Sequence, residues 1–137
     1  MPINRTGTMG GAYSPQPQTK ATGDSQQEAE LLIPGDGTIG NGANHFPICQ
    51  QTFTLMKATA AAIVLAAPSA LQAGTVINIT SGTAVAHVVT ATGLVQDGVT
   101  GGAKTTLTFG AFVGASITLV ASQQKWNVLG KNVVVIT

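Results

Sequence analysis

Apolar and polar residues alternate through most of residues 48–137, and this alternation predicts β-strands rather than helices. Turn-forming dipeptides such as Asp97-Gly98 and Gly101-Gly102 separate the alternating segments. Short strands at this spacing indicate an all-β fold, either a small antiparallel β-sandwich or a jelly-roll-like barrel. Eight strands are expected, near residues 51–56, 60–66, 74–80, 84–92, 104–109, 115–121, 125–129 and 132–136.

Residues 58–67 are ambiguous, because their many alanines favour a helix by intrinsic propensity. The consecutive residues Ile63, Val64 and Leu65, followed by Pro68, instead favour a strand. Val, Ile and Thr make up 33 of the 90 residues from 48 to 137, which supports the strand interpretation.

Residues 1–47 show no sustained periodicity, and they differ in composition from the rest of the chain. They contain five of the six prolines, eight of the 17 glycines and four of the five acidic residues. Ser25 to Glu28 resembles a helix start that Ala29 to Ile33 could continue, but Pro34 would end it. The chain is therefore expected to comprise an extended N-terminal arm, residues 1–47, and a β-sandwich or barrel body, residues 48–137.

The charge content argues against several classes of partner. Charged residues are 8% of the chain, against about 25% in an ordinary soluble domain, and the net charge is +1. A nearly neutral chain has no electrostatic attraction to nucleic acid or to an anionic membrane, so neither is expected as a partner. Ala58 to Ile79 is uncharged and long enough to span a bilayer, but Pro68, Gly74 and several polar residues argue against a span. The short basic-then-apolar stretch from Met56 resembles a secretory signal, but it lies too far inside the sequence.

The same composition points to assembly with other protein. The body has only four aromatic residues, and alanine and threonine occupy many of its presumed inward positions, so its own core is modest. Oligomerisation would bury additional apolar surface and stabilise the fold. A surface with so few charges is also unusual for a solitary soluble monomer.

Few residues are suited to catalysis or metal binding, and neither an enzyme nor a cofactor is expected. Gly35 to Gly40 matches G-x-G-x-x-G, but Pro34 precedes it and no helix can follow, which favours a turn over a dinucleotide site. His45 and Cys49 are only two potential zinc ligands. His87 lies on an alternating apolar face, as expected for a core or oligomer-interface histidine.

Trp126 is the only tryptophan, and the residues around it predict a hairpin in which Trp126 begins the return strand. In that position the ring would cover one end of the core. An alternative role is contact with a ligand, such as a sugar that stacks on the ring.

Two segments carry a resemblance to a known class of protein. They are Gly114–Val120 with Lys125–Gly130 (G-A-S-I-T-L-V and K-W-N-V-L-G), and Leu65–Thr80 (L-A-A-P-S-A-L-Q-A-G-T-V-I-N-I-T). Over residues 52–130 the chain resembles the β modules of tailed-bacteriophage virion proteins, which occur in capsid decoration (cement) proteins and in head or tail fibres. The resemblance implies a virion structural protein on the capsid surface, usually a homotrimer, and supplies no catalytic residues.

An arm that precedes a β body suits a decoration protein, because an extended segment can add contacts or strands to neighbouring coat subunits. The expected partners are the major capsid protein and further copies of this chain. The alternative is a head-fibre or tail-tip module that binds host glycans, with Trp126 and nearby loops as the contact. The residues expected to bind the partner through the arm are Ile3, Arg5, Tyr13, Leu31, Leu32, Ile33, Ile39 and Phe46.

Overall fold

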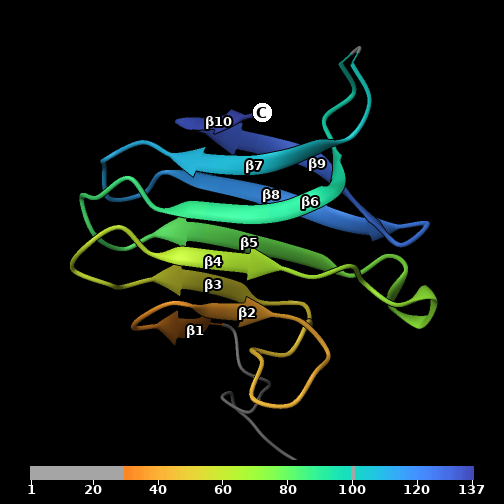
Figure 1. The fold of residues 1–137 in the computed structure, drawn as a ribbon, viewed down its shortest axis with the longest axis horizontal. Coiled ribbons are helices and arrows are strands. Elements are labelled where there is room, and N and C mark those ends of the chain that lie inside the picture. Colours follow the sequence, from red (N-terminus) through yellow and green to blue (C-terminus); the bar gives the residue numbers. More distant parts are fainter. Residues whose placement is uncertain (1–29, 100) are drawn as a thin grey trace, which may run out of the picture.

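The structure is a computed structural model that describes residues 30–99 and 101–137, and these residues form an all-β fold (Figure 1). The only helical element in the described residues is η1, a 3-10 turn at Ala70–Gln72. The strands are β1 (Glu30–Ile33), β2 (Gly37–Ile39), β3 (Thr52–Leu55), β4 (Ala62–Leu65), β5 (Val76–Ser81), β6 (Val88–Gln96), β7 (Lys104–Phe109), β8 (Ser116–Ser122), β9 (Lys125–Asn132) and β10 (Val134–Ile136).

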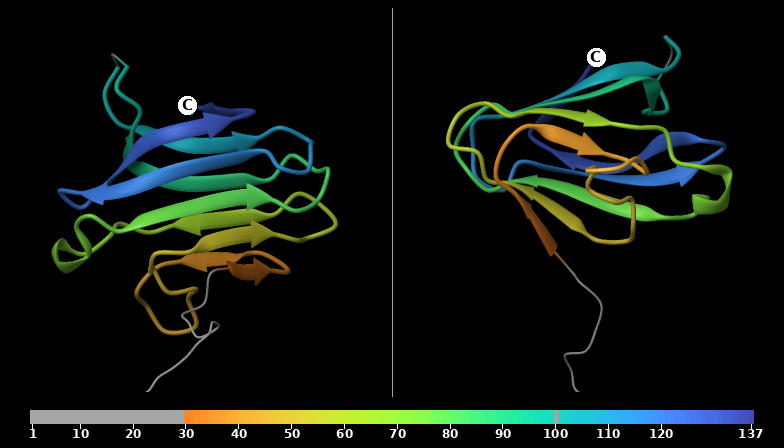
Figure 2. Two further views of the ribbon diagram at one scale, coloured as in Figure 1. Left: turned by 180° about the vertical axis from the view of Figure 1, so that it is seen from behind. Right: turned by 60° about the horizontal axis from the view of Figure 1, so that its bottom comes forward.

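All ten strands belong to one mixed sheet that curls back on itself into a half-barrel. The main strand order is β1-β3-β5-β8-β9-β6-β4-β2, and β7 joins the other side of β6 and is followed by β10. Figure 2 (right) shows the two halves of the curled sheet facing each other, with β4, β6 and β7 on one side and β3, β5 and β8 on the other. The apolar side chains of both halves therefore point into one shared interior.

The first six strands wind between these halves. The odd strands β1, β3 and β5 lie parallel in one half, and the even strands β2, β4 and β6 lie parallel in the other. Gly37 pairs with Ile63 and Ile63 pairs with Val89, so one full winding advances the chain by 26 residues. Each winding places one strand in each half of the sheet.

The last four strands use antiparallel pairing. β8 pairs with β5 and β9, and β7 pairs with β6 and β10. Strand β6 connects the halves, because Val88 to Thr90 pair with β4 and β7 whereas Val95 and Gln96 pair with β9. Gly93 lies between these two stretches with a φ of 66°, a left-handed conformation that suits glycine.

The core is formed by the inward-facing residue of each alternating pair. One ladder runs across Phe53, Ile79 and Ile117, and another runs across Ile63, Val89 and Leu107. All of these side chains are buried, and at the next inward positions Ile33, Ile39, Leu55 and Leu65 are buried as well. Burial of matched ladders from two facing half-sheets holds the half-barrel together.

The expectation of an all-β, barrel-like body is confirmed, and residues 60–66 contain a strand as predicted. The expectation of purely antiparallel pairing is wrong, because five of the strand pairings are parallel. The boundary at residue 47 is also wrong for residues 30–47, since β1 and β2 pair with β3 and β4. Residues 30–33 form a strand in place of the helix considered for that region.

Candidate functional site

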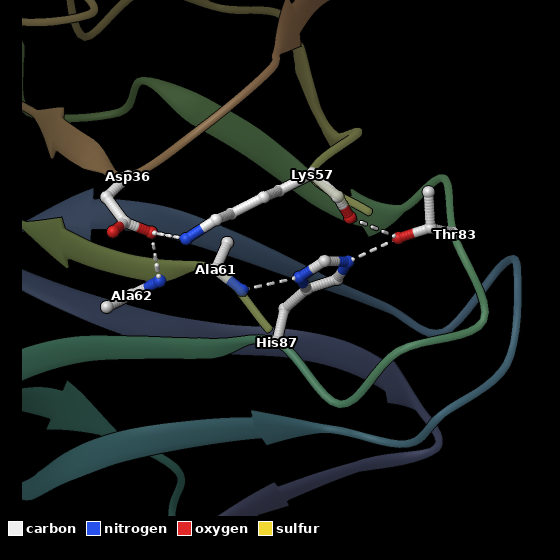
Figure 3. A network of polar contacts seen from close by, with 6 residues as sticks. All are labelled: Asp36, Lys57, Ala61, Ala62, Thr83 and His87. Atoms are coloured by element: carbon white, nitrogen blue, oxygen red, sulfur yellow. Dashed lines mark hydrogen bonds and ion pairs between the residues drawn. The ribbon is translucent and has the colours of Figure 1, made fainter. Parts of the chain in front are cut away.

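A cluster of polar contacts gathers at one end of the sheet, where the chain turns from an odd strand to the following even strand (Figure 3). His87, just before β6, is fully buried at its centre. The Ala61 amide donates to His87 Nδ1 at 3.0 Å, and His87 Nε2 lies 2.8 Å from Thr83 Oγ1. Thr83 Oγ1 in turn donates to the carbonyl oxygen of Lys57 at 2.9 Å.

These contacts assign the protonation state of His87. Nδ1 accepts a hydrogen bond, and the Thr83 hydroxyl already donates its proton to Lys57, so Nε2 must carry the ring proton and donate to Thr83. Burial disfavours the imidazolium, and the Lys57 charge adds to this effect, so the pKa of His87 lies below its ordinary value of 6.5. Both ring nitrogens are thus occupied within the protein.

Asp36 extends the cluster to the first winding. Its Oδ1 accepts hydrogen bonds from the Ala62 amide at 2.9 Å and from Lys57 Nζ at 3.0 Å. These two contacts lower the pKa of the Asp36 carboxyl, with the Ala62 amide as the larger cause.

Three of the contacts in this cluster repeat the step of the winding. They join residues exactly one winding of 26 positions apart: Asp36 with Ala62, Lys57 with Thr83, and Ala61 with His87. The cluster therefore fastens three successive corners to one another, and its chemistry is structural.

Trp126 also lies in the core. Its side chain is fully buried, and its Nε1 donates to the Ala66 carbonyl at 2.9 Å. The predicted hairpin is confirmed, because β8 and β9 pair with Ala121 opposite Trp126. Neither Trp126 nor His87 reaches the surface, so the predictions of an oligomer-interface or ligand-contact role for them are wrong.

The other candidate chemical sites from the sequence contain no recognisable ligand geometry. Gly37–Ile39 within the glycine-rich motif is strand β2, not the start of a helix. His45 Nδ1 accepts a hydrogen bond from the Gly42 amide, and Cys49 is an exposed free thiol. Within residues 30–99 and 101–137, no three His, Cys, Asp or Glu side chains gather as they would around a metal ion.

The residues expected to anchor the arm divide into three groups. Ile3, Arg5 and Tyr13 lie outside the described residues. Ile33 and Ile39 are fully buried in the core, so the prediction that they contact a partner is wrong.

Three expected anchors remain on β1 and beside β2. Leu31 and Phe46 are partly buried against the core, whereas Leu32 is 55% exposed on the outer face of β1. Of the expected anchors within the described residues, Leu32 is the one that is largely accessible.

The edge strands β1 and β2 differ in how their outer edges are used. The loop after β2 folds back, so that the Phe46 amide donates to Thr38 and the Gly40 amide donates to Phe46. Phe46 thereby occupies the edge of β2, and its ring lies close against Gly37. Strand β1 pairs only with β3 among the described residues, and residues 1–29 join the fold at this strand.

The outer surfaces of the two half-sheets also differ in chemistry. On β1, β3, β5, β8 and β9 the outward positions are mostly Thr, Asn and Ser, and some of them bond to each other, as Thr118 does with Asn78 and Thr54 with Glu30. The outward positions on β2, β4, β6, β7 and β10 are mainly Val and Thr.

Among the described residues, no helix has the length and apolar character needed to cross a membrane. No protein-family model matches the chain, and no curated protein matches it as a relative.

Proposed function

We propose that this chain is a structural protein of a virus particle, a capsid decoration protein that binds the major capsid protein lattice at the outer surface of the head. In this proposal residues 1–29 anchor the protein to neighbouring coat subunits, and the β body forms a trimer on the surface. The observation that carries the proposal is the combination of a charge-poor β body with a long segment that enters at the open edge strand β1.

The length of that segment suits an anchor. A fully extended chain of 29 residues reaches about 95 Å, which exceeds the width of a small domain several-fold. Its start at β1 also places it next to backbone groups that no other described strand uses. Many copies bound to one lattice would make even a weak contact per copy effective.

The experiment compares particle binding by three proteins: the full chain, residues 30–137 alone, and residues 30–137 with a Gly/Ser segment of 29 residues in front. Each is mixed with particles stripped of their surface proteins, taken from the virus that encodes the chain, and co-sedimented. We expect the full chain to saturate the particles, and both shortened proteins to bind at least tenfold more weakly.

Three outcomes would contradict parts of this proposal. Equal binding by all three proteins would show that residues 1–29 are not the anchor. Failure of the full chain to bind stripped particles, together with its absence from purified virions by mass spectrometry, would overturn the decoration function. Circular dichroism on each protein establishes that the β body is folded in every comparison.

A fibre module that binds host glycans retains one supporting observation. Phe112 and Val113, in the loop between β7 and β8, are 65% and 68% exposed, so an aromatic ring is available at that loop although Trp126 is not. Glycan-array binding by the full chain that disappears in Phe112→Ala and persists in Val99→Ala would support this function over decoration. Val99 is the matched control because it is 64% exposed in a different loop.

A further inference from the structure

Eight outward-facing residues on one half of the sheet form a continuous surface, which we call the valine–threonine face. The strand register aligns them in two rows of four that run across neighbouring strands. One row is Ala62, Val88, Thr108 and Val135, and the other is Thr38, Val64, Thr90 and Thr106. Val64 is 49% exposed and Val135 is 61% exposed, so both rows contain apolar side chains open to solvent.

No charged residue belongs to this face. The nearest charges lie at its margins: Lys104 is two residues before Thr106, and Asp36 and Lys57 pair with each other beside Ala62. A surface without net charge meets a copy of itself without like-charge repulsion, and it offers no charged group for a partner of opposite sign. This feature favours another copy of the same chain over an ionic partner.

The opposite outer face is a poorer candidate for self-association. Its rows contain Glu30, Asn78 and Asn132, and its Thr54 and Thr118 hydroxyls already bond within the face. Burial of those polar groups would bring a desolvation cost that the valine–threonine face largely avoids.

The dimensions of the valine–threonine face fit a threefold arrangement. Each row crosses four strands, which at a spacing of about 4.8 Å gives a width of about 19 Å. Three flat faces of that width close a triangular prism whose axis lies about 5.5 Å from each face. This distance is half of the separation of about 10 Å at which two sheets pack face to face, so the side chains would fill the space around the axis.

We propose that the valine–threonine face is the surface through which three copies of this chain associate, with the strands running along the threefold axis. The inference gives the trimer of the proposed function a specific surface, but it can be tested without any capsid. Each copy contributes only about 260 Å² of projected area, well below the roughly 800 Å² per partner of a standard interface. The assembly is therefore expected to depend on concentration.

The experiment uses the full chain and two matched lysine variants. Thr90→Lys puts a charge in the middle of the valine–threonine face, and Thr80→Lys puts the same charge in the middle of the polar face. Both threonines are half-buried and both lie between two neighbouring strands. Sedimentation equilibrium from 5 µM to 1 mM then gives the mass, and emission from the buried Trp126 reports whether each variant is folded.

We expect the wild type and Thr80→Lys to reach the mass of a trimer, and Thr90→Lys to shift the association midpoint at least tenfold or to stay monomeric. A milder variant, Val64→Thr, should weaken association less, because it retains the shape of the side chain and adds no charge. A wild type that is monomeric at 1 mM would overturn the inference, as would a trimer that Thr80→Lys disrupts and Thr90→Lys does not. Either result leaves the particle-binding experiment free to succeed or fail independently.

Discussion

At the scale of single residues, His87 shows how one side chain can fix the protonation state that the fold requires. Its two ring nitrogens meet one donor and one acceptor, the Ala61 amide and the Thr83 hydroxyl. A second ring proton on Nδ1 would point at the Ala61 amide proton and break that hydrogen bond. The native structure therefore holds this histidine neutral.

The free energy of unfolding should consequently fall as the pH drops below 6.5. In the unfolded chain His87 takes up a proton near its ordinary pKa of 6.5, whereas the folded-state pKa is lower, so the unfolded state binds more protons. The loss approaches about 1.4 kcal/mol per pH unit between these two pKa values. Urea denaturation at a series of pH values between 7.5 and 5 measures it.

Two histidine variants separate this effect from general acid sensitivity. His87→Gln keeps a donor and an acceptor but does not titrate, so its stability should change less between pH 7 and 5 than that of the wild type. His45→Gln, at the other histidine, should retain the pH dependence of the wild type. Equal pH profiles for the wild type and His87→Gln would contradict the assignment.

Trp126 should be the most costly aromatic side chain to truncate. Trp126→Ala is expected to destabilise the fold by about 3–5 kcal/mol, because it empties a large, fully buried site. Trp126→Phe keeps much of the apolar volume but leaves the Ala66 carbonyl without its donor, which costs about 1–3 kcal/mol. Chemical denaturation followed by circular dichroism measures both, and an equal loss in the two variants would show that the hydrogen bond contributes nothing.

At the scale of elements, the turn between β8 and β9 is short and built from unfavourable residues. Ser122 pairs with Lys125, so the loop has two residues, Gln123 and Gln124, and both have a positive φ. Such a two-residue turn normally contains Asn and Gly, which adopt this conformation at little cost.

Replacing Gln124 with Gly should therefore stabilise the protein by about 1 kcal/mol, and Gln123→Asn should add to this gain. Gln96→Gly is the matched control, because Gln96 is an exposed glutamine that ends an extended strand, where glycine is unfavourable. Thermal unfolding should show a higher Tm for the turn variant and a lower Tm for the control. A lower Tm for Gln124→Gly would contradict the strain argument.

The alternation of apolar and polar residues was sufficient to locate the strands but not to pair them. Phe53 and Ile79 face the interior whether β3 and β5 run parallel or antiparallel, so the pattern carries no information on direction. The parallel arrangement follows from the winding, in which an even strand always intervenes. The sequence shows no obvious repeat at 26 residues, because the two strands of each winding share only apolar character.

Residues 30–47 were assigned to the arm because their strands have only four and three residues and are surrounded by Gly and Pro. The sequence correctly indicated a core position for His87 and a hairpin at Trp126, yet it gave no hint of the hydrogen bonds at His87. A signal was available: Thr83 and Ala61 stand one winding from Lys57 and His87, but the winding must be known before that spacing has meaning.

At the scale of the whole molecule, the position of the first strands predicts where the chain can be shortened. Removal of residues 1–29 should leave the urea midpoint of the body within the error of the wild type, because every described strand remains. Removal of residues 1–47 deletes β1 and β2 with Ile33 and Ile39, and it uncovers the core beneath them. We expect the shorter protein to unfold or aggregate, as judged by circular dichroism and size-exclusion chromatography, and a cooperative unfolding transition in it would contradict this fold.

The winding of 26 residues also has a consequence for how such a molecule can change in length. Each circuit brings its own pair of strands and its own contacts to the circuits before and after it, so a duplicated circuit could be inserted as a complete unit between two existing ones. An insertion of any other length would have to be absorbed in a loop, or it would turn inward-facing side chains outward. The height of the structure is therefore expected to vary among descendants of this sequence in whole steps, set by the spacing between adjacent strands.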